Sequence, residues 1–278
     1  MGAGPEGSPL GLIAGNGRFP FLVAAAGRRA GRRVVAVAIN EETDPALERE
    51  VDEIHWVSLG QLGRCIDALK TGGVREAVMA GQVKHRQIFA GIVPDLKMMG
   101  VLARLAVKST DSLIGAVAEA LGRDGITLLP STALLQDQLA TPGVMTRRRP
   151  SSDELKDVEY GREVARALAG FDVGQTVVVK DRAAVAVEAM EGTDEAIRRA
   201  GRIAGPGCTV VKVAKPRQDV RFDVPVVGPG TVTAMREAGA TTLALQAGAT
   251  LLLDRADLLA EADRAQVALW GFEAPARP

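Results

Sequence analysis

The chain has 278 residues, of which 47% are hydrophobic and 24% charged, and its 34 basic residues balance its 34 acidic ones. This length allows two domains of ordinary size, and the composition is that of a compact globular protein rather than a disordered one. A net charge of zero provides no overall field for nucleic acid or an anionic membrane, so any phosphate binding has to be local.

The two cysteines, Cys65 and Cys208, are far apart and lack CxxC spacing. This favours buried thiols in a reducing compartment over a disulfide framework or a zinc site. Residues 1–9 have neither the basic nor the apolar part of a signal peptide, so we expect a flexible tail there. No apolar run approaches the ~18 residues that a spanning helix needs. These features predict a cytoplasmic protein.

Strand-like and helix-like segments alternate from residue 10 onward. Short apolar runs, rich in β-branched residues, occupy 10–15, 33–39, 53–58 and 76–83, and helical segments separate the first from the second and the third from the fourth. Two further helical segments, 96–109 and 110–125, lead to a strand at 126–131. Strands that are almost continuously apolar are typical of a parallel sheet covered on both faces. We therefore predict a Rossmann-like α/β domain over 10–135.

Residues 136–152 contain two prolines, a glycine and three consecutive arginines, which is the composition of a linker. The following residues, 153–278, again alternate and include a hairpin predicted to turn at Lys180 and Asp181. The fold class is thus α/β, with two α/β domains joined by a linker. Parallel sheets bind ligands beyond the carboxyl ends of their strands, and pockets favour domain interfaces, so we expect the active site in the interdomain cleft.

Glycines and polar residues occur at the ends of two predicted strands of the first half. Gly15, Asn16 and Gly17 lie at the end of the first strand. Gly81, Gln82, Lys84, His85 and Arg86 lie at the end of the fourth. Free amides at a helix start would suit a phosphate there. A turn can also need glycine without any ligand, and the GxGxxG fingerprint of dinucleotide sites is missing. His55 lies within a predicted strand and is expected in the core or at a sheet edge.

Two predicted helix starts offer further candidates. Ser109 or Thr110 can cap one helix, with Asp111 in its first turn. Thr193 is the expected N-cap of another, with Asp194 after it and Glu191 before it. Capping explains both patterns without a ligand, and substrate binding is the alternative.

The stretch KVAKPRQDVRFDVPVVGPGTV, residues 212–232, concentrates charge directly after a predicted strand at 208–214. Its polar residues are Lys215, Arg217, Gln218, Asp219, Arg221 and Asp223. A solvated loop is one interpretation. The other is phosphoryl transfer, in which Asp219 and Asp223 ligate Mg²⁺ and the cations neutralise phosphate oxygens. Pro225 favours extended backbone before it, which would put Arg221 and Asp223 on one face.

Other hydrolase chemistries lack their residues. Two histidines are too few for a binuclear metallophosphatase, and neither a GxSxG elbow nor a GxxxxGK[ST] phosphate loop occurs. Carboxylates, lysine and arginine remain as the candidate catalytic equipment.

These residues resemble the LpxI-type UDP-2,3-diacylglucosamine pyrophosphatases, a two-domain family of lipid A biosynthesis. The resemblance rests on GLIAGNGRFP, AGQV, KSTDSLI, VEAMEGTDEAI and KPRQDVRFDVPVVG. The last is the most specific, because K-P-x-Q-[DE]-x-R-x-D-x-P spans eleven positions of one loop. Asn16 and Val227 depart from the family pattern, where we expect a small residue and isoleucine.

The resemblance implies Mg²⁺-dependent hydrolysis, with Mn²⁺ as a substitute, of UDP-2,3-diacylglucosamine to UMP and 2,3-diacylglucosamine 1-phosphate. It also implies an essential carboxylate at Asp223 and water attack at the glucosamine-side phosphorus. The implied partner is a lipid-linked sugar nucleotide, met by transient peripheral contact with the cytoplasmic face of the inner membrane. We expect no nucleic acid partner, and a homodimer is one option.

Two other functions remain open on the residues alone. The same loops could make a sugar-nucleotide or lipid binding protein without turnover. GLIAGNG could also be read as the dinucleotide loop of an oxidoreductase.

Overall fold

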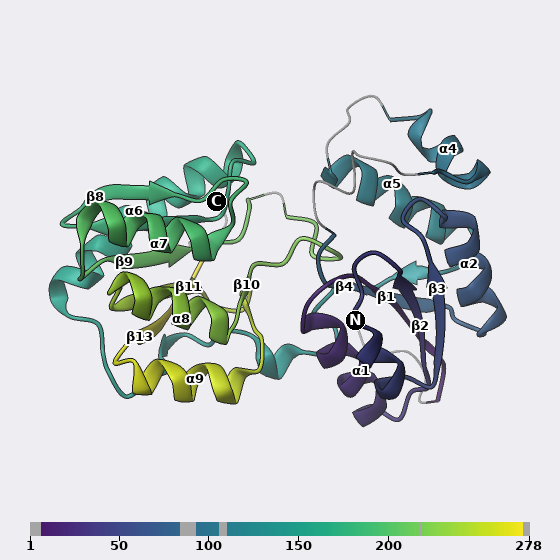
Figure 1. Cartoon of the computed structure of the whole chain (residues 1–278), viewed down its shortest axis with the longest axis horizontal. Coiled ribbons are helices and arrows are strands. Elements are labelled where there is room, and N and C mark those ends of the chain that lie inside the picture. The colour runs from purple at the N-terminus through teal and green to yellow at the C-terminus, as the bar shows by residue number, and fades with distance from the viewer. Residues whose placement is uncertain (1–6, 84–92, 106–109, 217, 275–278) are drawn as a thin grey trace. The chain divides into compact units, whose positions relative to one another are not determined.

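The computed structural model describes residues 7–83, 93–105, 110–216 and 218–274. Contacts between Cα atoms divide the chain into two compact units. Unit 1 comprises residues 1–135 together with Val220–Asp223, and unit 2 comprises Gln136–Asp219 and Val224–Pro278. The two-domain α/β expectation is confirmed, and each unit is described by itself below (Figure 1).

Unit 1 is built on a five-stranded parallel sheet with the strand order β3-β2-β1-β4-β5. Its elements are β1 (Leu10–Ala14), α1 (Phe19–Arg29), β2 (Val34–Ile39), the 3₁₀ helix η1 (Pro45–Glu50), β3 (Glu53–Val57), α2 (Leu62–Thr71), β4 (Glu76–Ala80), α4 (Leu96–Leu102), α5 (Thr110–Arg123) and β5 (Thr127–Leu128). The order reverses between β1 and β4, which is the doubly wound arrangement.

Helices cover the sheet of unit 1 as the apolar strands require. Ile66 of α2 and Leu121 of α5 are fully buried and pack with Val35 and Val37 of β2. Val23 of α1 is also buried, and α1 contacts β1 and β4. Every residue of β2 from 34 to 38 is inaccessible to solvent, so both faces of this strand are covered. This explains why its sequence is continuously apolar and does not alternate between apolar and polar residues.

Unit 2 is built on a six-stranded mixed sheet with the order β6-β13-β11-β9-β7-β8. Its elements are the 3₁₀ helix η2 (Gln136–Gln138), β6 (Gly143–Val144), α6 (Ser152–Gly170), β7 (Thr176–Lys180), β8 (Ala183–Val187), α7 (Thr193–Ala204), β9 (Thr209–Lys212), β10 (Val226–Val227), α8 (Pro229–Ala238), β11 (Thr242–Gln246), β12 (Leu251–Leu252), α9 (Arg255–Arg264) and β13 (Ala268–Phe272). Strands β9, β11 and β13 are parallel, β7 is antiparallel to β8 and β9, and β10 pairs separately with β12.

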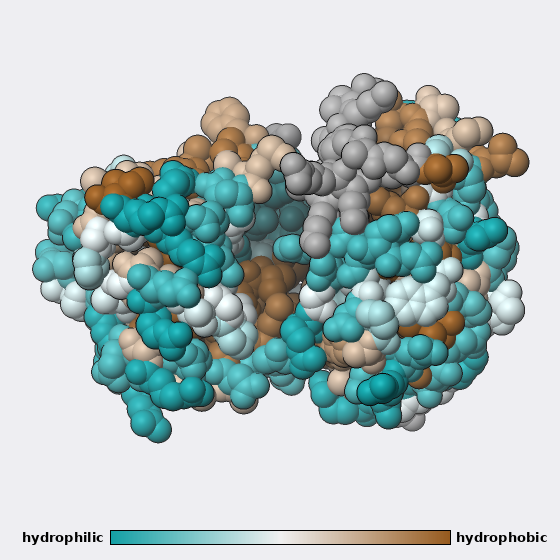
Figure 2. Space-filling view, in the orientation of Figure 1, coloured by the Kyte–Doolittle hydropathy of each residue, from teal (hydrophilic) through white to brown (hydrophobic). Residues whose placement is uncertain are grey.

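Two different helix layers pack on the sheet of unit 2. Helix α6 lies against one face, where its Val158 and Ala165 join a core with Val177 and Val211. Helices α7, α8 and α9 supply Ile197, Met235 and Leu258 to a separate core that contains Val178, Val210 and Leu243. The side of unit 2 that α7 and α9 cover is largely hydrophilic in the space-filling view (Figure 2).

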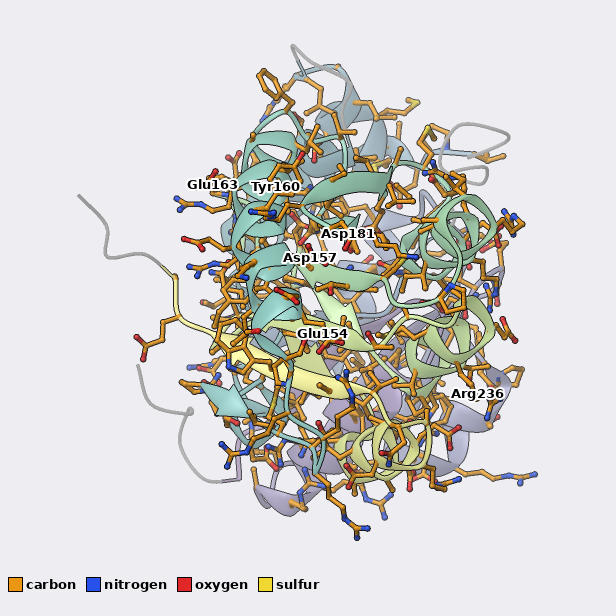
Figure 3. The ribbon with its side chains drawn as sticks, turned by 90° about the vertical axis from the view of Figure 1, so that its left-hand side faces the viewer. Glu154, Asp157, Tyr160, Glu163, Asp181 and Arg236 are labelled. Atoms are coloured by element: carbon orange, nitrogen blue, oxygen red, sulfur yellow. The ribbon has the colours of Figure 1, made fainter. Side chains whose placement is uncertain are left out.

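The predicted hairpin is confirmed as β7 and β8. Its turn residues Asp181 and Arg182 have φ of 51° and 59°, the left-handed conformations of a tight hairpin turn. The carboxylate of Asp157 on α6 accepts a hydrogen bond from Arg182 N at 2.7 Å. Asp157 on α6 and Asp181 in the hairpin turn lie near each other in Figure 3, and the bond from Arg182 holds the hairpin tip to the helix.

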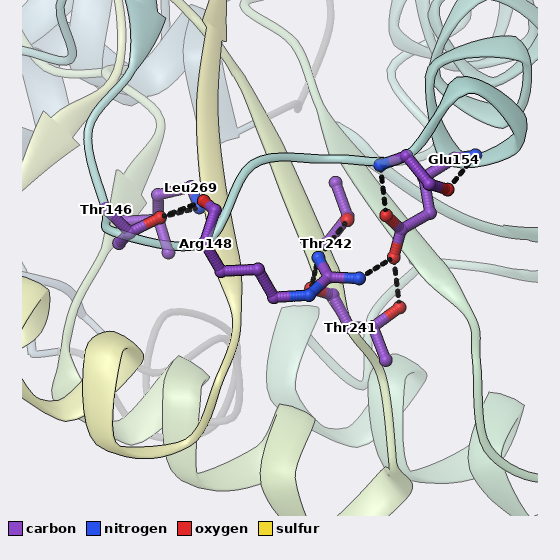
Figure 4. Close-up of polar contacts among 7 residues, drawn as sticks. Thr146, Arg148, Glu154, Thr241, Thr242 and Leu269 are labelled. Carbon is purple, nitrogen blue, oxygen red and sulfur yellow. Dashed lines mark hydrogen bonds and ion pairs between the residues drawn. The ribbon is translucent and has the colours of Figure 1, made fainter.

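The segment 136–152, predicted as a linker, contributes ordered structure to unit 2. Its β6 pairs with β13, and Arg148 donates to Glu154 Oε1 at 2.7 Å and to Thr241 O at 3.0 Å (Figure 4). Glu154 also accepts from Ser151 N and Thr241 Oγ1, and with Ser151 it forms a capping box at the start of α6. Contacts with distant residues thus give this proline- and arginine-rich segment a defined structure within unit 2.

Among the described residues, no helix is both long enough and apolar enough to cross a bilayer.

Candidate functional site

The turns that follow β1 and β4 lie together at the point where the strand order of unit 1 reverses. Asn16 N donates to Gln82 O at 2.8 Å, and Gln82 N donates to Asn16 O at 3.1 Å. Ligands of open α/β sheets bind beyond such a switch point. The residues that follow the first and fourth strands, singled out from the sequence, therefore meet at Asn16 and Gln82.

Two of the candidate glycines have a structural reason to be glycine. A Cβ added to Gly15 would lie 2.6 Å from Gln82 O, and one added to Gly81 would lie 2.6 Å from Asn16 O. Gly81 also has a φ of +94°. The close approach of the two turns explains both residues without a ligand.

Gly17 differs from them, because its φ is +92° and nothing lies within 4 Å of the Cβ position. It precedes α1, whose N-cap residue Arg18 makes no side-chain capping bond. The Asn16 side chain instead donates to Glu42 Oε2 at 3.3 Å. The backbone around Gly17 thus remains the candidate phosphate-binding part of this turn.

Several other candidates of unit 1 are settled only in part. Lys84, His85 and Arg86 lie outside the described residues. Asp111 occupies the first turn of α5, and its side chain is likewise outside the description. His55 is on the edge strand β3, where its Nε2 lies 2.6 Å from Glu53 Oε1, which confirms the sheet-edge interpretation.

In unit 2, a buried polar network joins the end of β9 to the start of α7. Lys212, the last residue of β9, is 5% exposed. Its Nζ donates to Thr193 Oγ1 at 2.7 Å and to Thr176 Oγ1 at 3.2 Å, and it lies 3.6 Å from Glu188 Oε2. Thr193 Oγ1 donates in turn to Glu188 Oε1 at 2.7 Å.

The electrostatics of this network favour a charged Glu188. Burial alone would raise the pKa of its carboxyl, but the Lys212 ammonium and the threonine hydroxyls outweigh burial and lower it. Sequence reasoning passed over Lys212 and Glu188. The signal was a lysine inside the apolar run CTVVKVA, since a charge in a buried strand needs a partner.

The predicted function of Thr193 as N-cap is wrong. Gly192 is the N-cap of α7, with a φ of +84° and no side-chain cap, and Thr193 is the first helical residue. A glycine reaches that φ freely, so the helix starts one residue earlier than the hydroxyl suggests. The Thr193 hydroxyl is instead occupied by Lys212 and Glu188.

Asp194 and Glu191 also have defined partners. Asp194 Oδ1 accepts from Thr231 Oγ1 at 2.9 Å, which joins the first turns of α7 and α8. Glu191 accepts from Arg199 Nη2 at 2.5 Å and from Ala189 N at 3.1 Å, which holds the turn before α7. Both carboxylates therefore stabilise the local structure around the start of α7, and this role requires no ligand.

The loop of residues 215–223 follows β9 by two residues. Lys215 Nζ lies 2.5 Å from Asp172 Oδ1, and only 16% of its side chain is exposed. Gln218 N donates to Lys215 O at 3.2 Å, and its side-chain Nε2 is buried with no hydrogen-bond partner among the described residues. Arg217 lies outside the described residues. The side chain of Lys215 and the Nε2 atom of Gln218, both in unit 2, are thus largely buried.

The second half of this loop belongs to unit 1. Ser131 N donates to Val220 O at 2.9 Å, and Ser131 Oγ donates to Arg221 O at 2.6 Å. Val220, Arg221 and Phe222 form a turn, so the extended backbone expected there is wrong. The bonds to Ser131 fix the turn where the local pattern favoured extension. Asp223 clusters with unit 1 and Asp219 with unit 2.

The carboxylates of the loop are of the chemical type that ligates magnesium. No group of three or more His, Cys, Asp and Glu side chains in the described parts of the chain is arranged to hold a metal. Mg²⁺ in phosphate chemistry is commonly held by one or two carboxylates, with substrate phosphates and water completing the octahedron. Asp219 and Asp223 are carboxylates of the type that such sites use, and they cluster with different units.

Comparisons with known proteins agree along almost the whole chain. The family model described as "LpxI N-terminal domain" matches residues 9–138, and "LpxI C-terminal domain" matches residues 141–270. A curated relative from Caulobacter vibrioides, named UDP-2,3-diacylglucosamine pyrophosphatase LpxI, is 30% identical over 97% of this chain and 99% of its own.

Solved structures show only distant likeness. The biotin carboxylase subunit of pyruvate carboxylase is 17% identical with a TM-score of 0.27, over 71% of this chain and 42% of that one. The protein gox2253 is 12% identical with a TM-score of 0.31, over 94% and 88%. Neither supports an argument about function. The two domain models and the relative that aligns over almost its full length show the family: the chain belongs to the LpxI family.

Proposed function

We propose that the protein hydrolyses the diphosphate of UDP-2,3-diacylglucosamine to UMP and 2,3-diacylglucosamine 1-phosphate. One observation carries this proposal: the relative named for that pyrophosphatase aligns over 97% of the chain and 99% of its own length. The substrate it is named for is diacylated, so we further propose peripheral action at the cytoplasmic face of the inner membrane.

The 215–223 loop is the part of the chain to which we assign the chemistry. Asp219 and Asp223 would hold Mg²⁺, which supplies charge neutralisation to the diphosphate when bound. Lys215 and Arg221 bind the phosphate oxygens as cations. Gln218 Nε2, which is buried and has no hydrogen-bond partner in the described part of the chain, is available as a further donor. Asp223 either helps to hold the metal or accepts a proton from the attacking water.

In the structure, the ammonium of Lys215 forms an ion pair with Asp172. Its ion pair with Asp172 keeps the ammonium at the start of the loop, with the side chain largely buried. A diphosphate carries more negative charge than one carboxylate that is 58% exposed, so substrate competes for the same ammonium. Substrate binding between the two units stays a prediction.

The test is release of UMP from UDP-2,3-diacylglucosamine by the purified chain with Mg²⁺. UDP-N-acetylglucosamine, which carries a single N-acetyl group in place of the two acyl chains, serves as the matched control substrate. Release of UMP from the diacylated substrate alone supports the proposal. Tight binding without release would replace it with a sugar-nucleotide binding protein, and a nicotinamide absorbance change would replace it with an oxidoreductase.

A further inference from the structure

The buried pair of Lys212 and Glu188 lies at the edge of unit 2 from which the 215–223 loop departs. Lys212 ends β9 and pairs with Thr176 at the start of β7. Glu188 follows β8, and its backbone N donates to Thr176 O at 2.9 Å, so it lies at the same place. Helix α7 begins at the same edge with Thr193. Three separate chain segments therefore meet on one ammonium group.

Each side chain of this network has polar partners within it. The ammonium of Lys212 has three protons, and it faces two hydroxyls and one carboxylate. The Thr193 hydroxyl donates to Glu188 and accepts from Lys212. Each bond has one geometry, so the network specifies where β9 ends relative to where α7 starts.

Stability by itself is a weak reason for such a pair. Two charges lose hydration when they are buried, and replacing a buried ion pair by apolar side chains of similar volume is often neutral or stabilising. Apolar packing at this edge would serve the core equally well. Apolar packing would not provide directional hydrogen bonds at the end of β9, from which Val213 and Ala214 lead to Lys215.

The residues between the network and the loop make backbone contacts at the same edge, and Val213 also packs in the core beside α6. Val213 N donates to Gln175 O at 2.9 Å, and Ala214 N donates to Gln246 Oε1 at 3.1 Å. Gln175 N in turn donates to Glu188 Oε2 at 3.4 Å. A change in Lys212 or Glu188 therefore reaches the backbone that presents Lys215.

We propose that Lys212 is a positioning residue for the 215–223 loop, acting with Glu188 through Thr193 and the backbone of Val213 and Ala214. This inference rests on the proposed hydrolysis for its effect on rate. It assigns Lys212 no contact with substrate, because its ammonium is already surrounded by partners of its own chain.

The test removes one charge or both. Lys212→Met leaves the Glu188 carboxylate buried without its cation, and it should lower both stability and kcat. Lys212→Met combined with Glu188→Leu removes both charges, so most of the stability should return. The positioning is still absent in this double variant, so kcat should stay about 10-fold or more below wild type, with KM within about 3-fold. A double variant with wild-type kcat would overturn the proposal.

The matched control is a second, partly buried ion pair of unit 2, Arg148 with Glu154. Arg148 and Glu154 contact Thr241 at the start of β11 (Figure 4). Because β11 is parallel to β9, this is the strand end opposite to the one where β9 ends at Lys212. Arg148→Met with Glu154→Leu should lose stability and keep kcat within about 2-fold, because neither side chain reaches the loop. An equal loss of kcat in this control would make the Lys212 effect one of general stability and would also overturn the proposal.

A second measurement does not depend on turnover. Amide hydrogen exchange at Val213 and Ala214, without substrate, should be about 10-fold or more faster in the Lys212→Met/Glu188→Leu variant and unchanged in the control variant. Unchanged exchange in the former would overturn the positioning inference. If the wild-type chain releases no UMP, the proposed hydrolysis fails, and the exchange rates still decide whether Lys212 holds the loop.

Discussion

The carboxyl of Glu154 should make unit 2 acid-sensitive, and the structure gives the size of the effect. It accepts hydrogen bonds from Ser151 N at 2.7 Å, Arg148 Nη2 at 2.7 Å and Thr241 Oγ1 at 2.6 Å (Figure 4). Burial alone would raise its pKa, but these donors outweigh burial and hold the pKa at about 2, below the ordinary value of 4.5.

The gap between 4.5 and about 2 converts at ~1.36 kcal/mol per pKa step into about 3 kcal/mol of folding free energy. The sign follows from the direction. A carboxyl whose pKa is lower in the folded state stabilises the fold above its unfolded pKa. That contribution is lost as the pH falls from about 4.5 towards 2. Glu154→Gln mimics the protonated carboxyl and should therefore cost about 3 kcal/mol at pH 7.

The assay is urea unfolding followed by tryptophan fluorescence between pH 7 and pH 3. The chain has two tryptophans, Trp56 in unit 1 and Trp270 in unit 2, so a Trp56→Phe background reports on unit 2 alone. Glu163→Gln, an exposed change on the same helix (Figure 3), is the control and should stay within about 0.5 kcal/mol of wild type.

The dependence on pH is the decisive part of this measurement. The deficit of Glu154→Gln should be largest at pH 7 and should shrink as the pH falls, because wild type then loses the same contribution. A deficit that stays constant from pH 7 to pH 3, or no deficit at pH 7, would refute the assignment of the low pKa to these three donors.

Three further predictions concern the proposed reaction. Excess EDTA should abolish UMP release and added Mg²⁺ or Mn²⁺ should restore it, so full activity in EDTA contradicts the metal assignment. Asp223→Ala should keep the wild-type melting temperature and lose on the order of 10²-fold in kcat, and unchanged turnover removes this carboxylate from the mechanism. Separately produced segments 1–135 and 140–278 should show no turnover even when mixed, since residues 220–223 cluster with unit 1 but are encoded with the second segment. A second segment active alone would disprove the need for both.

The local pattern of the sequence was sufficient for the class of fold and for most elements. Apolar runs of strand length alternating with helical segments predicted two α/β units, and the hairpin turn was predicted one residue from Asp181 and Arg182. The glycines after β1 and β4 marked two strand exits, and these do lie side by side at Asn16 and Gln82. Such features depend on periodicity and on φ, which neighbouring residues determine.

Other features were decided only by contacts between distant parts of the chain. The Lys212–Glu188 pair joins residues 24 positions apart, and it takes the hydroxyl of Thr193 that the local pattern assigned to a cap. The turn at Val220–Phe222 forms against Ser131, about 90 positions earlier, where the alternation of polar and apolar residues before Pro225 favoured extension. A single sequence shows which side chains need partners but not which partners the strand order brings to them, because nonlocal pairing is set by the packing of the whole unit.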